Sequence, residues 1–209
     1  MEKNMLIAIL RKVPDEKLER TVLAIAAGGI WTIEVTFDHT RQDHIAHEQA
    51  QIRALISCLG PDMMIGAGTV LTVEEVRAAR DAGARIIISP DVNPDVIGET
   101  KRLGLISCPG ALTPSEITLA HRCGADMVKV FPAGQLGPAY IRAVRGPLAH
   151  IPLIAVGGVN AENIADFLRA GCAGAGLGGE LVKKELIEKD DYAGLEALAA
   201  NIVRAAELA

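Results

Sequence analysis

The stretch RCGADMVKVFP, residues 122–132, contains three local signals in succession. It starts at the end of a helical pattern, passes through a glycine that can adopt the left-handed conformation of a helix C-terminus, and continues as a short apolar strand. The segments DAGARIIISP (81–90) and RLGLISCPG (102–110) have the same order of signals. The glycines of the three segments are 21 and 20 residues apart, about the length of one strand and one helix. This spacing indicates a repeated strand–helix unit.

Extended along the chain, the same signals predict eight strands, near residues 5–11, 31–37, 63–69, 85–90, 104–110, 127–133, 151–157 and 173–178. Most are continuously apolar and rich in Ile and Val, as expected of parallel strands buried on both faces. Helix start signals lie between them, including capping boxes that begin at Thr72 and Thr113. Eight strands alternating with helices predict a single-domain (β/α)8 TIM barrel that spans residues 1–209. The alternative is a doubly wound open sheet, but no Gly-x-Gly-x-x-Gly follows the first strand.

The composition limits the classes of function. A net charge of −5 gives no support for nucleic-acid or anionic-membrane binding through the overall field, and no apolar stretch is long enough to span a membrane. The first apolar run is followed by Pro14, Asp15 and Glu16 rather than by a cleavage site, so it predicts a strand and not a signal peptide. The four cysteines have no Cys-x-x-Cys spacing, which is typical of reduced thiols. We therefore expect a cytoplasmic protein without nucleic-acid or membrane partners, in which an anionic substrate needs a local site.

Two charged residues interrupt strands that are otherwise apolar. Glu34 lies within IEV and Lys129 lies within VKV. Ionised side chains are rarely buried unless they are paired or used in function, because desolvation costs several kcal/mol per ion. The alternative for Lys129 alone is a strand residue whose ammonium reaches solvent, and the alternative for Glu34 alone is a structural ion pair. Because both are expected to point inwards from separate strands of one barrel, we favour a functional pair.

The chemistry of an amine and a carboxylate gives this pair a specific role. Burial disfavours the charged form of a lysine, so an apolar barrel makes a neutral amine available. A neutral amine attacks a ketone and forms a Schiff base, whose protonated nitrogen acts as an electron sink. A nearby carboxylate can carry protons to and from the carbinol and the hydroxyl of the departing aldehyde. Lys129 and Glu34 are therefore the candidate catalytic residues of an imine-forming aldolase.

Further candidates lie at the carboxyl ends of the strands, where such barrels place their chemistry. The segments AVGGVN and GLGG end the seventh and eighth strands, whose loops commonly bind phosphate through backbone N–H groups. The alternative for these glycines is a purely conformational role. Arg11 suits the carboxylate of a 2-oxo acid, although a solvated strand-end base is the alternative, and Thr69 could contact the same carboxylate. With Phe131 added, the candidate substrate-binding residues are Arg11, Thr69, Phe131, Gly157, Gly158, Gly178 and Gly179.

The stretch DHTRQDHIAHE, residues 38–48, is rich in possible metal ligands. His44 and His47 have the spacing to share one helix face. No further ordered ligand spacing follows, so a polar loop and an exposed helix face are the preferred interpretation. The sequence therefore predicts no metal site and no cofactor.

Six segments resemble the 2-keto-3-deoxy-6-phosphogluconate (KDPG) and 4-hydroxy-2-oxoglutarate (KHG) aldolases and their relatives, the 2-keto-3-deoxy-6-phosphogalactonate (KDPGal) aldolases. The segments cover nearly the whole chain in order and are IEVTF, GAGTVLT, ISPDVNPDVI, CPGALTPSEI, VKVFPAGQLGPAYIRAVRGP and AVGGVNAENIADFLRAGCAGAGLGGEL. The resemblance implies that Lys129 is the Schiff-base lysine, that Glu34 shuttles protons and that Thr69 lies near the pyruvate carboxylate. It also implies that the glycines after the last two strands hold a distal phosphate, and that the enzyme is a homotrimer without a metal.

Three positions bear on the substrate that the resemblance implies. Phosphogluconate-type members carry an arginine four residues after the glutamate, where this chain has Asp38, followed by His39. A phosphogalactonate-type member has an arginine at the end of the first strand, where this chain has Arg11. Gly179 replaces the serine that usually follows Gly-Leu-Gly. Because the changes at Asp38, His39 and Gly179 touch groups that, by the resemblance, recognise the far end of the substrate, the sequence specifies the chemistry more closely than the substrate.

We therefore expect cleavage of a 2-keto-3-deoxy-6-phospho acid, of KDPG or KDPGal type, into pyruvate and an aldehyde such as glyceraldehyde 3-phosphate. 4-Hydroxy-2-oxoglutarate is a further candidate substrate. Two alternatives stay open on the sequence alone. One is a phosphate-binding barrel with isomerase or synthase chemistry, in which Lys129 acts only electrostatically. The other is a non-catalytic binder of sugar-acid phosphates.

Overall fold

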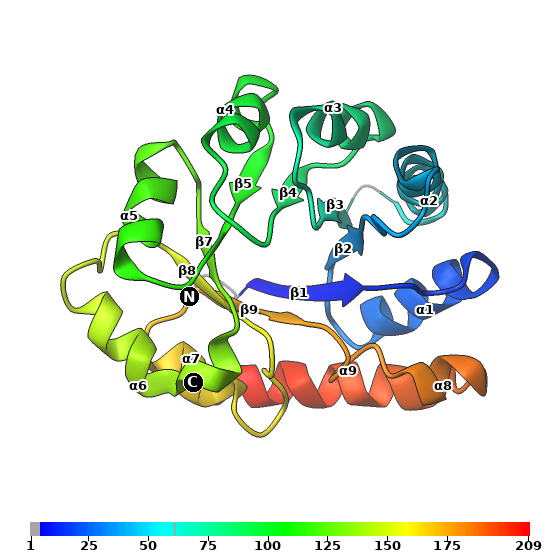
Figure 1. Cartoon of the computed structure of the whole chain (residues 1–209). Helices are drawn as coiled ribbons and strands as arrows, with labels where there is room; N and C mark the ends of the chain where they lie inside the picture. Colours follow the sequence, from blue (N-terminus) through cyan, green and yellow to red (C-terminus); the bar gives the residue numbers. More distant parts are fainter. Residues whose placement is uncertain (1–4, 61) are drawn as a thin grey trace.

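Parallel strands alternate with helices along the chain in the computed structural model, which describes residues 5–60 and 62–209 (Figure 1). Within those residues the strands are β1 (Met5–Leu10), β2 (Thr32–Thr36), β3 (Met64–Gly68), β4 (Ile86–Ile88), β5 (Ile106–Cys108), β6 (Gly110–Ala111), β7 (Val128–Val130), β8 (Leu153–Val156) and β9 (Gly174–Leu177). They form one sheet in the order β5-β4-β3-β2-β1-β9-β8-β7-β6. Every pairing is parallel, as the continuously apolar strands predicted.

The sheet closes into a barrel at its fifth predicted strand. The two ends of the sheet, β5 and β6, are separated in the chain only by Pro109, so one continuous segment pairs with β4 on one side and with β7 on the other. Proline has no N–H to donate, but the carbonyl of Pro109 accepts a hydrogen bond from the N–H of Lys129 at 2.9 Å. The eight predicted strands are therefore confirmed, with the fifth in two short pieces, and the open-sheet alternative is wrong.

The register places Glu34 and Lys129 on the inner face of the barrel. Glu34 is level with Ile9 of β1, and Lys129 is level with Ile154 of β8. Both isoleucines belong to the small apolar cluster inside the barrel, and because side chains alternate across a strand, residues level with them point the same way. A second, larger cluster fills the space between the strands and the helices. The barrel thus has an apolar interior with two charged side chains in it.

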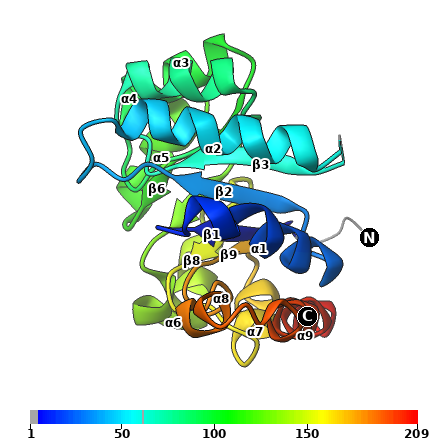
Figure 2. The same cartoon turned by 90° about the vertical axis from the view of Figure 1, so that its right-hand side faces the viewer.

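Helices cover the outside of the strands. They are α1 (Asp15–Ala27), α2 (His44–Cys58), α3 (Val73–Ala82), α4 (Pro94–Arg102), α5 (Pro114–Arg122), α6 (Ala133–Arg145), α7 (Ile164–Arg169), α8 (Lys184–Glu188) and α9 (Tyr192–Glu207). Figure 2 shows the strands between α2, α3 and α4 on one side and α6 to α9 on the other. Among the described helices, none combines the length and apolar character needed to cross a membrane.

The predicted helix starts are confirmed. The hydroxyls of Thr72 and Thr113 accept hydrogen bonds from the N–H groups of Glu75 and Glu116, at 3.2 and 3.3 Å, and each glutamate bonds back to the N–H of its threonine. Such caps stabilise a helix by about 1 kcal/mol each. They also define where the loops after β3 and β6 end, and these loops lie at the same end of the barrel as the candidate site residues.

Candidate functional site

A cavity of about 610 Å³ opens at the carboxyl ends of the strands. Its walls come from residues within or directly after β1, β3, β4, β7, β8 and β9. Eight of the nine candidate residues border it, namely Arg11, Thr69, Lys129, Phe131, Gly157, Gly158, Gly178 and Gly179. The ninth, Glu34, is buried in the barrel and does not border the cavity. Residues from six separate segments thus meet where the barrel fold predicts the chemistry.

Lys129 borders the cavity while remaining only 6% exposed. Its ammonium nitrogen lies 5.3 Å from the centroid of the Phe131 ring, within the range of a cation–π contact. No hydrogen bond or ion pair joins this nitrogen to any residue of the described ranges 5–60 and 62–209. The low exposure argues against the alternative of a strand residue whose ammonium reaches solvent. Instead, the amine faces a cavity that can admit a ligand.

Glu34 is 1% exposed, and one of its carboxyl oxygens, Oε1, has no hydrogen-bond partner. Its carboxyl packs against Gly68, where any side chain would overlap it, so this close approach requires a glycine. Burial raises the pKa of Glu34, while the positive charges of Lys129 and Arg11 act to lower it. Among the described residues Glu34 forms no ion pair, which argues against the structural ion-pair alternative. A buried carboxyl without a partner is the kind of group that calls for a functional explanation.

The cavity wall carries more positive than negative charge. Arg11, Lys12 and Lys129 border it, against one carboxylate, Glu180. Lys12 was not among the predicted residues, although its position beside Arg11 at the end of the first strand was an available signal. Its ammonium lies 3.4 Å from an oxygen of Asp38, a residue that does not itself border the cavity. An excess of basic side chains is what a local site for an anionic substrate would require in a chain of negative net charge.

Thr69 adopts a left-handed backbone conformation, with φ at +58°. This conformation is rare for a β-branched residue and costs roughly 1–3 kcal/mol. Strain of this kind persists where the surrounding structure requires it, and it is concentrated at ligand sites. The conformation and the position of Thr69 on the cavity wall agree with the predicted contact to a substrate group.

The glycines after β8 and β9 expose backbone to the cavity in different ways. Gly157 has φ at +90°, and a Cβ there would lie 3.1 Å from the ring of Phe131, so the turn and the packing both favour glycine. At Gly178 and Gly179, by contrast, no described atom lies within 4 Å of the position that a Cβ would take. These two residues therefore present bare main chain to the cavity. Bare main chain lets an anion approach backbone N–H groups closely.

The remaining wall is largely apolar and escaped the prediction from sequence. It comprises Ile9, Pro90, Val156, Val159 and Val182. The first four stand at or near the carboxyl ends of strands, and this position could have been recognised from the sequence. It does not identify a cavity residue, however, because apolar residues at strand ends are most often part of the core. The histidines of the 38–48 stretch do not border this cavity.

The chain is similar in sequence and in structure to known aldolases. The family model described as KDPG and KHG aldolase matches residues 1–198. The 2-dehydro-3-deoxy-6-phosphogalactonate aldolase of Escherichia coli (strain K12) is 38% identical over 183 residues, which are 87% of this chain and 86% of that protein. A solved structure described as native KDPGal has a TM-score of 0.87 at 34% identity and covers 99% of this chain and 96% of its own. The KDPG aldolase of Legionella pneumophila, solved with pyruvate as a covalent carbinolamine intermediate, has a TM-score of 0.84 at 26% identity, with coverages of 96% and 94%.

Proposed function

The chain belongs to the KDPG and KHG aldolase family, and from this premise we propose that Lys129 and Glu34 carry out its retro-aldol reaction. The enzyme is a class I aldolase, a carbon–carbon lyase of the KDPG and KDPGal type. Its substrate is a small 2-keto-3-deoxy-6-phospho sugar acid, and its products are pyruvate and an aldehyde such as glyceraldehyde 3-phosphate. The isomerase or synthase alternative and the non-catalytic alternative are not favoured.

The reaction starts at the amine of Lys129. The neutral amine attacks the C2 ketone of the substrate to form a carbinolamine, which loses water to give a protonated imine. The C3–C4 bond then breaks, and its electron pair moves towards the iminium nitrogen to form an enamine of pyruvate. The enamine takes a proton at C3, and water hydrolyses the resulting imine to release pyruvate. The low exposure of Lys129 and the absence of a described partner for its ammonium support this role.

Glu34 moves the protons in this sequence. As a carboxylate it accepts the proton of the C4 hydroxyl while the C3–C4 bond breaks, so the leaving group departs as an aldehyde. The same carboxyl returns protons during carbinolamine dehydration and hydrolysis. Its raised pKa supports the role, because a carboxyl held closer to the working pH exchanges protons more efficiently.

The other candidate residues orient the substrate. Arg11 and Thr69 bind its carboxylate, and Phe131 packs beside the reacting carbons. The main chain at Gly157, Gly158, Gly178 and Gly179 receives the phosphate. We favour the KDPGal type, because Arg11 borders the cavity whereas Asp38 is paired with Lys12.

We also propose the cellular setting and assembly. The four cysteines, Cys58, Cys108, Cys123 and Cys172, are free, which supports a cytoplasmic enzyme. Residues 1–209 act as one catalytic domain, and the family resemblance supports a homotrimer. Light scattering on the purified chain tests the assembly, since a monomer mass would contradict it.

The observation that carries the proposal is a buried lysine that borders the cavity without a described partner, inside the same barrel as a buried glutamate with an unpartnered oxygen. The decisive experiment is incubation with pyruvate and borohydride, followed by mass spectrometry of the peptides. We expect a reduced pyruvyl adduct on Lys129, with the exposed cavity lysine Lys12 as the internal control. An adduct elsewhere, or none, would overturn the assignment. Turnover of the KDPGal, KDPG and KHG substrates then ranks the substrate types.

A further inference from the structure

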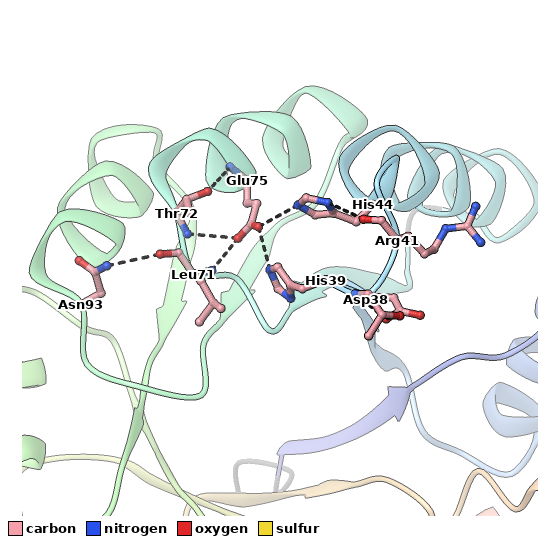
Figure 3. A network of polar contacts seen from close by, with 9 residues as sticks. Asp38, His39, Arg41, His44, Leu71, Thr72, Glu75 and Asn93 are labelled. Carbon is pink, nitrogen blue, oxygen red and sulfur yellow. Dashed lines mark hydrogen bonds and ion pairs between the residues drawn. The ribbon is translucent and has the colours of Figure 1, made fainter.

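A second group of ionisable side chains lies at the exits of β2 and β3, outside the cavity. His39 follows β2, His44 is the first residue of α2, and Glu75 lies in the first turn of α3. Figure 3 shows both imidazoles beside the carboxylate of Glu75, each joined to it by a dashed line. Its oxygen Oε1 lies 2.8 Å from Nε2 of His39 and 3.3 Å from Nε2 of His44. We refer to these three residues as the Glu75 cluster.

The carboxylate of Glu75 is held in a fixed orientation. Its other oxygen, Oε2, accepts hydrogen bonds from the N–H groups of Leu71 and Thr72, at 2.7 and 3.1 Å. Glu75 is only 2% exposed, so its side chain has little freedom to turn away. Oε1 is therefore the oxygen that faces the histidines, and it faces them because of the capping box (Figure 3).

The imidazole of His44 is oriented by a contact of its own. Its Nδ1 lies 3.2 Å from the carbonyl oxygen of Arg41, and a carbonyl only accepts, so Nδ1 carries the hydrogen. In the neutral ring Nε2 is then an unprotonated nitrogen with a lone pair, and it faces the lone pairs of a carboxylate oxygen. Either a proton on Nε2 or a metal ion shared by the two atoms makes this contact favourable. A histidine that donates its second N–H to a backbone carbonyl is also the usual form of a metal ligand.

The three atoms can meet one ion. One ring nitrogen of His39, one of His44 and a carboxylate oxygen of Glu75 all lie within 4.8 Å of one another. Zn²⁺ binds imidazole nitrogen at about 2.0–2.1 Å and carboxylate oxygen at about 2.0–2.2 Å. A single tetrahedral ion can contact all three residues once a small side-chain rotation widens the 2.8 Å contact between His39 and Glu75. Two imidazoles among three ligands favour Zn²⁺ and similar transition metals over Ca²⁺ or Mg²⁺, which prefer oxygen.

We propose that His39, His44 and Glu75 form a binding site for Zn²⁺ or a related divalent transition metal, with water as the fourth ligand. None of the three borders the substrate cavity, so the ion is structural and takes no part in the retro-aldol step. It joins the loop after β2 to the starts of α2 and α3. That loop also holds Asp38, the partner of Lys12 on the cavity wall, so the ion stabilises one rim of the active site.

The prediction of no metal in the 38–48 stretch rested on ligands sought within the stretch itself. The structure adds a third ligand from the next strand–helix unit, which sequence spacing could not reveal. His47, which has the spacing to share a helix face with His44, is not part of the cluster. Its Nε2 contacts Asp15 on α1 at 3.2 Å. His47 is therefore a matched control on the same helix as His44.

The test is a titration of the chelator-treated full chain with Zn²⁺ and, as a spectroscopic probe, Co²⁺. We expect one ion per chain, and binding weakened roughly 10-fold or more in His44→Ala and in His39→Ala. The control His47→Ala should bind like the unchanged chain. Glu75 is left intact because its carboxylate also caps α3. No Zn²⁺ binding by the unchanged chain, or equal binding by all four proteins, would overturn the proposal.

A measurement on the unchanged chain covers the case in which a variant fails to fold. Zn²⁺ should shift the imidazole NMR resonances of His39 and His44 and leave those of His47 in place. Shifts spread over all histidines, or confined to others, would refute the site. Trapping of pyruvate on Lys129 should persist without metal, so this test and the test of the aldolase proposal fail independently.

Discussion

The substrate cavity and the Glu75 cluster both gather ionisable side chains, but they satisfy them differently. In the cluster Oε2 of Glu75 accepts two backbone N–H bonds, and Oε1 faces two imidazoles. In the barrel Glu34 has an oxygen without a partner, and the ammonium of Lys129 has none among the described residues. Burying unpaired polar groups costs free energy, so a fold retains them where a ligand completes them. Both oxygens of the Glu75 carboxylate thus have polar neighbours, whereas the Glu34 carboxyl has an oxygen with none.

Substitution of Lys129 should give the largest effect on activity. It tests whether the buried amine beside the substrate cavity is kept for catalysis. Lys129→Met removes the nucleophile, so we expect kcat/KM for retro-aldol cleavage to fall by roughly 10⁴-fold or more. Because the change also removes a buried amine that has no hydrogen-bond partner among the described residues, the free energy of unfolding should rise, with Tm about 2–4 °C higher for each kcal/mol gained. Steady-state kinetics and calorimetry measure the two effects. Lys12→Met is the control, and it should mainly raise KM.

Substitution of Glu34, the other charged residue inside the barrel, should give the next largest effect. Glu34→Gln keeps the size of the side chain but ends its proton transfer, and we expect kcat to fall roughly 10²–10⁴-fold. Burial raises the pKa of Glu34 in the folded protein, so its ionisation should also be visible in the pH profile of kcat and vanish in the variant. Glu180→Gln, at the exposed carboxylate of the cavity wall, should leave kcat nearly unchanged. Equal losses in both variants would contradict a specific role for Glu34.

Besides burial, the pKa of Glu48 depends on charges in both regions, those of Glu34 and Glu75. Substitution of Glu48 should give the smallest of the three effects. Burial is the main cause that raises the pKa of this α2 carboxyl to about 8, and the negative charges of Glu34 and Glu75 add to it. The folded chain therefore holds a proton that the unfolded chain releases above its ordinary pKa near 4.5. Stability contributed by this group is full at low pH and is lost as the pH rises to about 8, by up to about 1.4 kcal/mol per pH unit.

Urea unfolding between pH 5 and 8 measures this dependence. Glu48→Gln should flatten the fall in the free energy of unfolding with pH and be the more stable protein at pH 8. Glu74→Gln, at an exposed position in the first turn of α3, is the matched control and should keep the slope of the unchanged chain. An unchanged slope in Glu48→Gln would show that this carboxyl does not carry the effect.

The prediction of the fold from sequence succeeded where the signals are local. Strand positions follow from apolar runs of a few residues, and the capping boxes at Thr72 and Thr113 depend only on residues three apart. The break at Pro109, where β5 ends and β6 starts, was not predicted. It depends on which neighbour each half of the segment pairs with, and pairing between strands is not encoded within either strand.

The candidate site shows the same division. Lys129 and Glu34 were identifiable because a charge within an apolar strand is a local anomaly. Lys12 was missed although it stands beside Arg11 at the end of the first strand, and its ion pair with Asp38, at the next strand's exit, could not be predicted from local sequence. The Glu75 cluster was missed for the same reason, since its carboxylate and its histidines come from different strand–helix units.

By itself the sequence determined the alternation of strands and helices, the aldolase family and the two charges inside the barrel. Each of these depends on residue types within a short window or on motifs in a fixed order. Only the tertiary structure decided that Glu34 lies unpaired against Gly68, that Lys129 faces a cavity, and that Glu75 meets two histidines. The physical reason is that burial, pairing and pKa are properties of neighbours in space, and closure of the barrel makes neighbours of segments far apart in the chain.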